Sequence, residues 1–228
     1  MRFPGSRRKP SAHSLHVKST AVHALVLAAG AARRFGSPKG LADYRGKPLI
    51  RHVVDSVIAA LATRPYATGL TVVLGPAPDP LRDALQGCSA DIIINPRWSD
   101  GLSSSLRVGL DSLPFGVSAV LVALGDQALV TSGDYQRLLD IAELNPERPV
   151  AAGYHHTDGY HHTDGYHHTV GVPAIFPTHY FERLRALQGD RGAASLLTSD
   201  NSVVSVDIPN ALFDIDTPEQ LAAALAQR

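Results

Sequence analysis

The sequence predicts an α/β domain in which a mostly parallel sheet has helices on both of its faces. Short apolar runs typical of buried strands alternate with amphipathic stretches along most of the chain, which is the pattern of such a three-layer α/β/α arrangement. The 228 residues, 44% of them hydrophobic and 18% charged, suffice for one sizeable core. Because ligands of such sheets bind at the carboxyl ends of the strands, functional residues are expected directly after each strand.

Short apolar runs are the expected strands. The first, Val22–Ala29 (VHALVLAA), is almost continuously apolar, as a strand buried on both faces is. Gly75 and Pro76 end the second run, and a similar Asn-Pro pair ends the third. In order, the expected strands are Val22–Ala29, Leu70–Leu74, Asp91–Ile94, Ala119–Leu124, Val150–Ala152, Ala174–Phe176 and Val203–Ile208.

Stretches with apolar residues at helical spacing are the expected helices. The last has the clearest start signal, because Thr217 can act as N-cap, Pro218 suits the first helical position and Gln220 completes a capping box. In order, the expected helices are Leu49–Ala62, Ser103–Leu113, Asp134–Leu144, Tyr180–Leu187 and Thr217–Ala226.

The charge balance and the cysteine content exclude several classes of protein. Lysine and arginine number 21 and so do aspartate and glutamate, which argues against nucleic acid or an anionic membrane as the main partner. One cysteine, Cys88, excludes an intrachain disulfide and a cysteine-based zinc cluster. The longest apolar runs, such as Ala21–Ala32, are too short to span a bilayer.

Residues 1–20 form a basic extension; the first acidic residue of the chain is Asp43. The extension has no apolar segment of the kind that a secretory signal contains, and we expect a cytoplasmic protein. Its composition favours disorder over an organelle transit peptide, and the folded domain is expected at residues 21–228.

Small residues and cations follow the first strand in Leu27–Lys39 (LAAGAARRFGSPK). Small side chains let backbone amides approach a ligand, and Arg34 and Lys39 are the cations that a polyphosphate needs. The segment contains no G-x-G-x-x-G, and its lysine does not follow a glycine, so it is neither a dinucleotide fingerprint nor a Walker A loop. On these features alone, an ordinary turn with two solvated cations is an equal alternative.

The full pattern L-A-A-G-x-x-x-R-F-G-x-P-K resembles the signature loop of MobA/MocA-type nucleotidyltransferases, which attach a nucleotide to the phosphate of a pterin cofactor. The resemblance implies the Rossmann-like fold of the nucleotide-diphospho-sugar transferases. It implies that Arg34 and Lys39 contact the triphosphate and act in catalysis. The residues that it places at the base and the phosphates are Leu27, Ala28, Ala29, Gly30 and Gly36.

A second motif, N-P-x-W-x-x-G-x-x-S-S, begins at Asn95 and opens the helix expected at Ser103–Leu113. Hydroxyls and free amides at a helix N-terminus suit an anion, although N-capping by serine alone would explain the serines. The motif also resembles one of the same family. This implies that Asn95, Gly101 and Ser104 lie by the nucleotide and that Trp98 packs.

Carboxylates at two places are the expected metal ligands. Asp126 ends the strand Ala119–Leu124 within Gly-Asp-Gln, where a carboxylate beside phosphates suits Mg²⁺ and a strand-end cap is the alternative. Asp214 and Asp216 belong to F-D-I-D-T-P-E, which resembles the family's D-x-D-T-P-E motif, and they point to the same side if the segment is extended. The resemblance implies Mg²⁺ on Asp126, which also makes this residue catalytic, and on one of the other two. Asp216 could equally support the last helix N-terminus.

The segment 154–169 is an uninterrupted repeat with three Tyr-His-His-Thr units. The family carries a shorter connection here, so we interpret twelve residues as a tandem duplication in a flexible surface loop. A Zn²⁺ or Ni²⁺ site on the histidines is the alternative.

Ala128, Val172 and Ala194 depart from the family pattern, and they leave the acceptor open.

The expected activity is a Mg²⁺-dependent nucleotidyl transfer from an NTP to a phosphate acceptor, with release of pyrophosphate. LAAG and GDQ are more similar to the cytidylyltransferase branch, which implies CTP and a molybdopterin-type acceptor. One alternative is a nucleotidyltransferase that acts on a sugar or alcohol phosphate. Another is a catalytically weak protein that holds the molybdenum cofactor for a molybdoenzyme or its chaperone.

Overall fold

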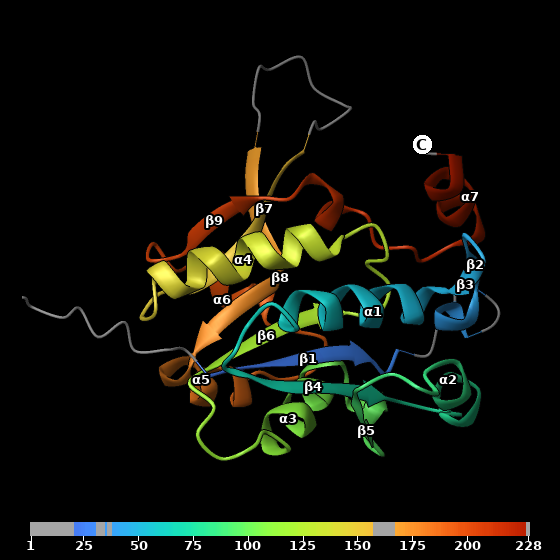
Figure 1. Cartoon of the computed structure of the whole chain (residues 1–228), viewed down its shortest axis with the longest axis horizontal. Coiled ribbons are helices and arrows are strands. Elements are labelled where there is room, and N and C mark those ends of the chain that lie inside the picture. Colours follow the sequence, from blue (N-terminus) through green and yellow to red (C-terminus); the bar gives the residue numbers. More distant parts are fainter. Residues whose placement is uncertain (1–20, 31–34, 36–37, 157–166, 227–228) are drawn as a thin grey trace, which may run out of the picture.

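The computed structural model describes residues 21–30, 35, 38–156 and 167–226. The extension at 1–20, Arg34, Gly36 and the middle of the histidine repeat lie outside the described residues. Figure 1 shows the expected architecture, a central sheet with helices on both faces. The α/β class predicted from the alternation of strands and helices is therefore confirmed.

The central sheet has seven strands, and β8 runs against all the others. On one side of β8, the strands β5, β4, β1 and β6 are parallel to one another. Their carboxyl ends therefore lie at the same edge of the sheet, as the sequence predicts. In spatial order the strands are β5 (Asp91–Ile94), β4 (Ala67–Leu74), β1 (Val22–Ala28), β6 (Ala119–Leu124), β8 (His167–Pro177), β7 (Val150–His156) and β9 (Val204–Asp207).

Two hydrophobic cores separate the layers. Alternate residues of β1 point to opposite faces, so Val26 packs in one core and Leu25 in the other. The first core lies under α1 (Leu49–Leu61) and α4 (Ser132–Leu144), which contact each other. The second lies under the three helices α3 (Leu102–Asp111), α5 (Phe181–Arg185) and α6 (Ala194–Leu197).

Several short elements were not predicted from the sequence, because they are too short to show a clear hydrophobic periodicity. These elements are β2 (Asp43–Tyr44), β3 (Lys47–Pro48), α2 (Asp79–Ala84), α6 and the 3₁₀ turns η1 (Lys39–Leu41), η2 (Trp98–Asp100), η3 (Thr178–Tyr180) and η4 (Pro209–Leu212). The last helix, α7 (Pro218–Ala226), begins as predicted. The Thr217 hydroxyl accepts from the Gln220 backbone N–H at 3.3 Å, and the Gln220 side chain accepts from the Thr217 N–H at 2.9 Å.

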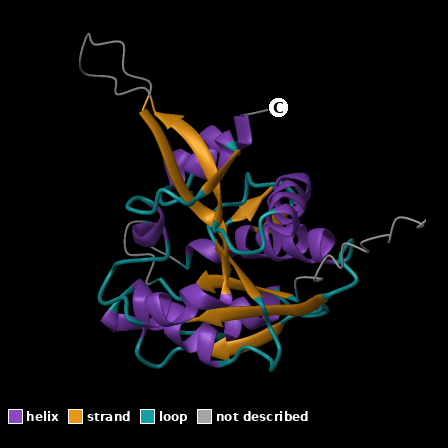
Figure 2. Cartoon of the chain, turned by 90° about the vertical axis from the view of Figure 1, so that its left-hand side faces the viewer, coloured by secondary structure: helices purple, strands orange, loops and turns teal. Residues whose placement is uncertain are grey.

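The β7–β8 hairpin corrects the expectation for the histidine repeat. Both ends of the repeat belong to the ladder, in which Tyr154 pairs with Thr169, His155 with His168 and His156 with His167. The expectation that the whole of 154–169 is a loop is therefore wrong at its two ends. Alternate pairs of an antiparallel ladder exchange hydrogen bonds, so a hairpin can continue past the edge of the neighbouring strands. Figure 2 shows this hairpin projecting from the body of the domain.

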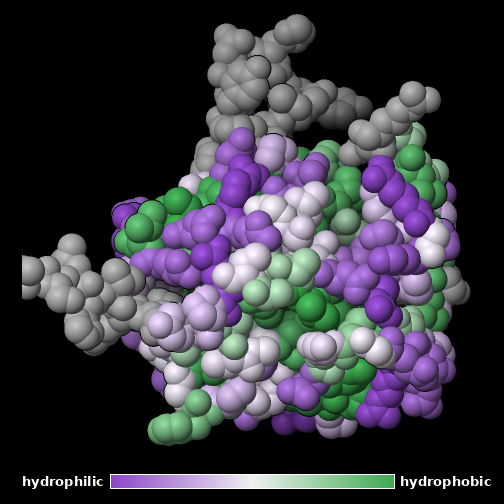
Figure 3. All heavy atoms as spheres, in the orientation of Figure 1, coloured by the Kyte–Doolittle hydropathy of each residue, from purple (hydrophilic) through white to green (hydrophobic). Residues whose placement is uncertain are grey.

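One face of the molecule carries both hydrophilic and hydrophobic residues. Figure 3 shows hydrophilic residues around a smaller hydrophobic area in the lower middle of the face seen in Figure 1. Within the described ranges, no helix is both long enough and apolar enough to cross a membrane.

Candidate active site

A cleft of about 910 Å³ opens at the carboxyl ends of β1, β4 and β6. Most of the residues predicted for the site line it, namely Leu27, Ala28, Ala29, Gly30, Lys39, Gly101, Asp126 and Asp216. Asn95, Ser104 and Asp214 do not line it, and Arg34 and Gly36 lie outside the described residues. Residues from four distant parts of the sequence thus converge on one cavity.

The wall of the cleft is built from close backbone contacts. A Cβ on Gly75 would lie 2.3 Å from the Ala29 carbonyl oxygen, and a Cβ on Gly125 would lie 2.8 Å from the Cβ of Ala28. The loops after β1, β4 and β6 therefore touch each other at positions where a larger side chain would not fit. This contact brings the first loop and Asp126 to the same cavity.

Lys39 is the centre of the charged part of the cleft. Its ammonium group donates to the carboxylate of Asp126 and to Asp216 Oδ1, the second at 2.6 Å. Burial opposes the positive charge, but the attraction of Asp126 and Asp216 outweighs it, so the pKa of Lys39 is raised above its ordinary value. Lys39 therefore stays charged at neutral pH.

The backbone of Ile215 brings the C-terminal carboxylates to Lys39. Its N–H donates to the Asp126 carbonyl oxygen at 3.2 Å, and its side chain, 1% exposed, packs with Tyr44 and Leu49. Ile215 is thus fixed between its two flanking aspartates. The carboxylates of both act electrostatically within the same group as Lys39 and Asp126.

The Asp214 carboxyl is strongly perturbed. Burial, together with the negative charge of Asp126, raises its pKa to about 6. One oxygen of Asp214 and one of Asp126 are buried without a hydrogen-bond partner. Buried anionic oxygens of this kind are stabilised by a cation or by a proton.

The donor set fits a divalent cation that prefers oxygen ligands, such as Mg²⁺ or Mn²⁺. Asp126, Asp214 and Asp216 supply carboxylate oxygens, two of which have no hydrogen-bond partner. In the part of the chain that the structure describes, no three His, Cys, Asp or Glu side chains form a ready-made metal cluster. The Lys39 ammonium group instead provides the positive charge between Asp126 and Asp216.

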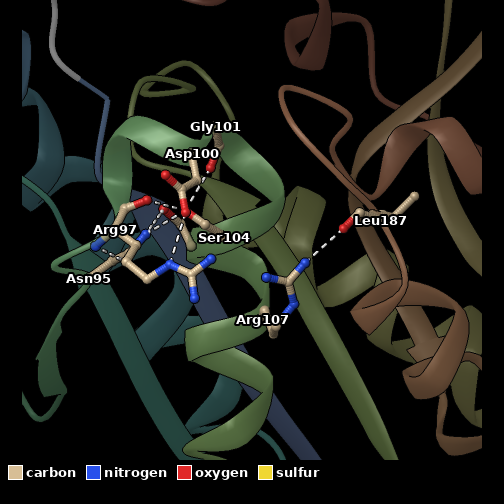
Figure 4. Close-up of polar contacts among 8 residues, drawn as sticks. Asn95, Arg97, Asp100, Gly101, Ser104, Arg107 and Leu187 are labelled. Atoms are coloured by element: carbon tan, nitrogen blue, oxygen red, sulfur yellow. Dashed lines mark hydrogen bonds and ion pairs between the residues drawn. The ribbon is translucent and has the colours of Figure 1, made fainter.

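Asn95 and Ser104 do not line the cleft but form hydrogen bonds within the second motif. Figure 4 shows Asn95, which is fully buried, donating to the Ser104 hydroxyl at 2.7 Å, while its own oxygen accepts from the Arg97 N–H at 2.9 Å. The Ser104 hydroxyl in turn lies 2.8 Å from the Gly101 carbonyl oxygen. These contacts fix the turn that presents Gly101 to the cleft. The direct nucleotide contact expected of Asn95 and Ser104 stays a prediction.

Gly101, rather than a serine, is the N-cap of α3, and it makes no side-chain cap. Serine capping was the simpler interpretation of the motif and is wrong. Gly101 has φ +93°, and a Cβ there would lie 2.4 Å from the carbonyl carbon of Gly189. Only glycine satisfies both constraints.

The loop after α5 forms a further wall of the cleft; its segment Gly189–Ala194 resembles a G-D-x-G-A-R stretch of the family, but none of its residues was predicted for the site. The Ser103 N–H donates to the Gly189 carbonyl at 3.0 Å, and Arg107 donates to the Leu187 carbonyl at 2.9 Å, as Figure 4 shows. Asp190 thereby lines the cleft. Trp98, expected to pack, also lines the cleft. Because this loop follows a helix, the rule that functional residues follow strands could not find it.

Comparison with known families assigns the chain. Residues 24–206 match the family model of the MobA-like NTP transferase domain. The chain belongs to the MobA-like NTP transferase family. The sequence-based resemblance to this family is therefore confirmed.

Curated relatives match parts of the chain. A protein of Paenarthrobacter nicotinovorans named nicotine blue oxidoreductase is 30% identical over 138 residues, which are 60% of this chain and 64% of that protein. A bifunctional protein GlmU of Kineococcus radiotolerans is 36% identical over 118 residues, which are 50% of this chain and 23% of that protein. The matched region thus spans less than two thirds of each relative.

Solved structures match nearly the whole chain. Rv0371c of Mycobacterium tuberculosis H37Rv is 26% identical with a TM-score of 0.72, and the match covers 91% of this chain and 98% of that one. The structure of the same protein described as a complex with manganese is 25% identical with a TM-score of 0.70, over 92% and 100% of the two chains. The 4-diphosphocytidyl-2C-methyl-D-erythritol synthase of Anaerococcus prevotii, 16% identical with a TM-score of 0.69 over 93% and 98%, shares the fold.

Proposed function

We propose that this protein is a divalent-metal-dependent nucleotidyltransferase that joins an NTP to a phosphate acceptor and releases pyrophosphate. One observation carries the proposal: Lys39 lies between the carboxylates of Asp126 and Asp216 in a large cleft at the carboxyl ends of the strands. A lysine held charged beside two acidic side chains suits a triphosphate with its counter-cation. Membership of the MobA-like NTP transferase family supports the same chemistry.

The reaction needs no general base from the protein. A phosphate monoester has its second pKa near about 6, so the acceptor is largely a dianion at neutral pH. Catalysis then consists of positioning the two anions and neutralising their charge. Lys39 would stabilise the negative charge that develops on the α-phosphate of the transferred nucleotidyl group and on the departing pyrophosphate. Arg34, whose placement lies outside the described residues, is proposed to assist it.

Asp126 and Asp216 would hold the metal ion, with Asp214, which interacts electrostatically with both, as an additional carboxylate. When bound, such an ion supplies positive charge to the phosphates and orients them. The proposed base-binding surface is the small-residue backbone Leu27–Gly30, and the wall made by Gly101 and Asp190 closes the opposite side.

The specific substrates that we propose are CTP and a molybdopterin-type acceptor. We propose Mg²⁺ as the metal ion and the cytoplasm as the location of the protein. CTP is supported by the similarity of LAAG and GDQ to the cytidylyltransferase branch. A distant fold relative, a CMP-2-keto-3-deoxy-manno-octonic acid synthetase that is 13% identical with a TM-score of 0.70, was solved in complex with CTP. A sugar or alcohol phosphate is the alternative acceptor.

A pyrophosphate-release screen tests the proposal. The protein is incubated with Mg²⁺ and each of the four NTPs, with and without molybdopterin. Release with CTP that requires molybdopterin is the expected result. Release that instead requires a sugar phosphate would change the acceptor, and no release with any acceptor would favour the cofactor-holding alternative.

A further inference from the structure

Gln127, the residue after Asp126, ties together parts of the chain that are distant in sequence. Its side chain is almost fully buried, with 2% of the residue exposed. The amide nitrogen donates to the Val172 carbonyl oxygen at 3.0 Å and to the Ala211 carbonyl oxygen at 3.0 Å. Both of these bonds go to backbone acceptors, and a hydrogen bond with the Gln127 side chain also acts to lower the pKa of Asp214, although burial and the charge of Asp126 outweigh it.

The two partners of Gln127 lie on segments that bound the charged group. Val172 belongs to β8, beside β6 in the sheet. Ala211 belongs to η4, the turn that leads directly into the segment of Asp214 and Asp216. The hydrogen bond from the Ile215 N–H to the Asp126 carbonyl is a second link between the turn after β6 and the Asp214–Asp216 segment. Gln127 therefore fixes where the C-terminal carboxylates stand relative to Asp126.

A packing role alone does not require this residue. A leucine or methionine would fill a similar volume, but it would leave two backbone carbonyls without their donor. The amide oxygen of Gln127 is itself buried without a hydrogen-bond partner, so the site retains a polar group at a cost. Turning the amide around would place that oxygen against two carbonyl oxygens, so the observed orientation is the one that the surroundings favour.

We propose that Gln127 is a positioning residue for the divalent metal ion. It holds β8 and the Asp214–Asp216 segment against Asp126, so that Asp126 and a carboxylate of that segment can bind one cation. This inference rests on the proposed function. Residues that orient metal ligands typically change metal affinity by about 10–100-fold when they are replaced. The effect should fall on the metal and not on the nucleotide, because Gln127 does not line the cleft.

The test compares Gln127→Met with Gln136→Met, a matched change on α4 at a side chain outside the cleft. Mn²⁺ affinity is measured by electron paramagnetic resonance of the free ion, and KM for CTP and kcat are measured over a range of Mn²⁺. We expect Gln127→Met to bind Mn²⁺ at least about tenfold more weakly, to recover kcat at high Mn²⁺ and to keep KM for CTP within about twofold. Gln136→Met should match the wild type.

Wild-type Mn²⁺ affinity in folded Gln127→Met would overturn the inference. If that variant does not fold, Gln127→Asn replaces it, because the shorter amide cannot reach both carbonyls; unchanged Mn²⁺ affinity there overturns the inference equally. A wild-type protein that binds neither Mn²⁺ nor CTP would overturn the proposed function itself, and the inference with it.

Discussion

The half of the domain up to Asp126, in the turn after β6, and the half that follows it contribute to the cleft in different ways. In the first half, Leu27–Gly30 and Asp126 stand where parallel strands end, so the local sequence and the strand-end rule locate them. In the second half, Asp216 reaches the cleft through the backbone bond of Ile215 and the side-chain bond of Lys39. The first half supplies a preformed surface together with Lys39 and Asp126, and the second half adds the Asp216 carboxylate through long-range contacts.

Removing Lys39 should have the largest effect, because its ammonium group joins the carboxylates that the two halves contribute to the cleft. Lys39→Ala is expected to lower kcat by about 10²–10³-fold, as the loss of one charge-stabilising donor does. Lys47→Ala is the control, since that lysine is exposed and pairs with Asp55. Steady-state kinetics measures both. An unchanged kcat in folded Lys39→Ala would remove the lysine from the mechanism.

Asp126→Asn separates metal binding from folding. The change keeps the shape of the side chain but removes a proposed ligand charge, so a higher Mg²⁺ concentration should be needed for half-maximal activity. The melting temperature should stay close to that of the wild type. Asp111→Asn, at an exposed ion pair with Arg185, is the control. If the Mg²⁺ dependence of Asp126→Asn equals that of the wild type, the metal lies elsewhere.

Asp214 predicts how stability depends on pH in the absence of metal. Its pKa is about 6 in the folded protein against an ordinary value of 3.8, so the folded state binds more protons between these values. The contribution of Asp214 to stability is therefore present below about pH 4 and lost as pH rises through about 6. Asp214→Asn cannot ionise, so its stability relative to the wild type should rise by about 2 kcal/mol between pH 4.5 and pH 7.5.

Urea unfolding in chelator-containing buffer at the two pH values measures this difference. Asp207→Asn, at an exposed position of β9, serves as the control and should show no such trend. A difference between Asp214→Asn and wild type that is the same at both pH values would contradict the burial argument.

The histidine repeat should matter least to stability. Removing His155–Tyr166 leaves Tyr154 and Thr169, a pair of the ladder, joined through His167 and His168, which is the length of a two-residue hairpin loop. Loop-closure entropy changes slowly with length, so the free energy of unfolding should change by well under about 1 kcal/mol. This corresponds to a shift in Tm below about 4 °C.

Thermal melts of the full and shortened chains, with and without chelator, decide between a passive repeat and a structural metal site. The KM of the acceptor is free to shift, whereas NTP binding should not. A large fall in Tm caused by chelator in the full chain alone would show that the histidines hold a structural metal.

The sequence was sufficient for the architecture and for most of the cleft. Strong apolar runs placed the strands of the parallel half almost at their observed bounds; Ala119–Leu124, for example, was predicted residue for residue. The C-terminal motif predicted a carboxylate near Asp126, and Asp216 lines the cleft and contacts Lys39, whereas Asp214 does not line it. These features depend on local pattern, which a single sequence contains.

The features that sequence analysis missed depend on contacts between distant segments. Asn95 belongs to a resembling motif, yet its side chain is used on Ser104 and the Arg97 backbone. Asp190 follows a helix and reaches the cleft because two glycine backbones, at 101 and 189, can touch. The role of Gln127 depends on where Val172 and Ala211 stand in space. No periodicity encodes such pairings.

Calorimetric titration with CTP and with GTP, in the presence and absence of Mg²⁺, measures whether the cleft around Lys39, Asp126 and Asp216 binds a nucleoside triphosphate with a divalent cation. We expect CTP to bind more tightly than GTP and Mg²⁺ to strengthen the binding. Tighter binding of GTP would change the base and leave the site in place. Failure of every nucleotide to bind with Mg²⁺ present would contradict the claim.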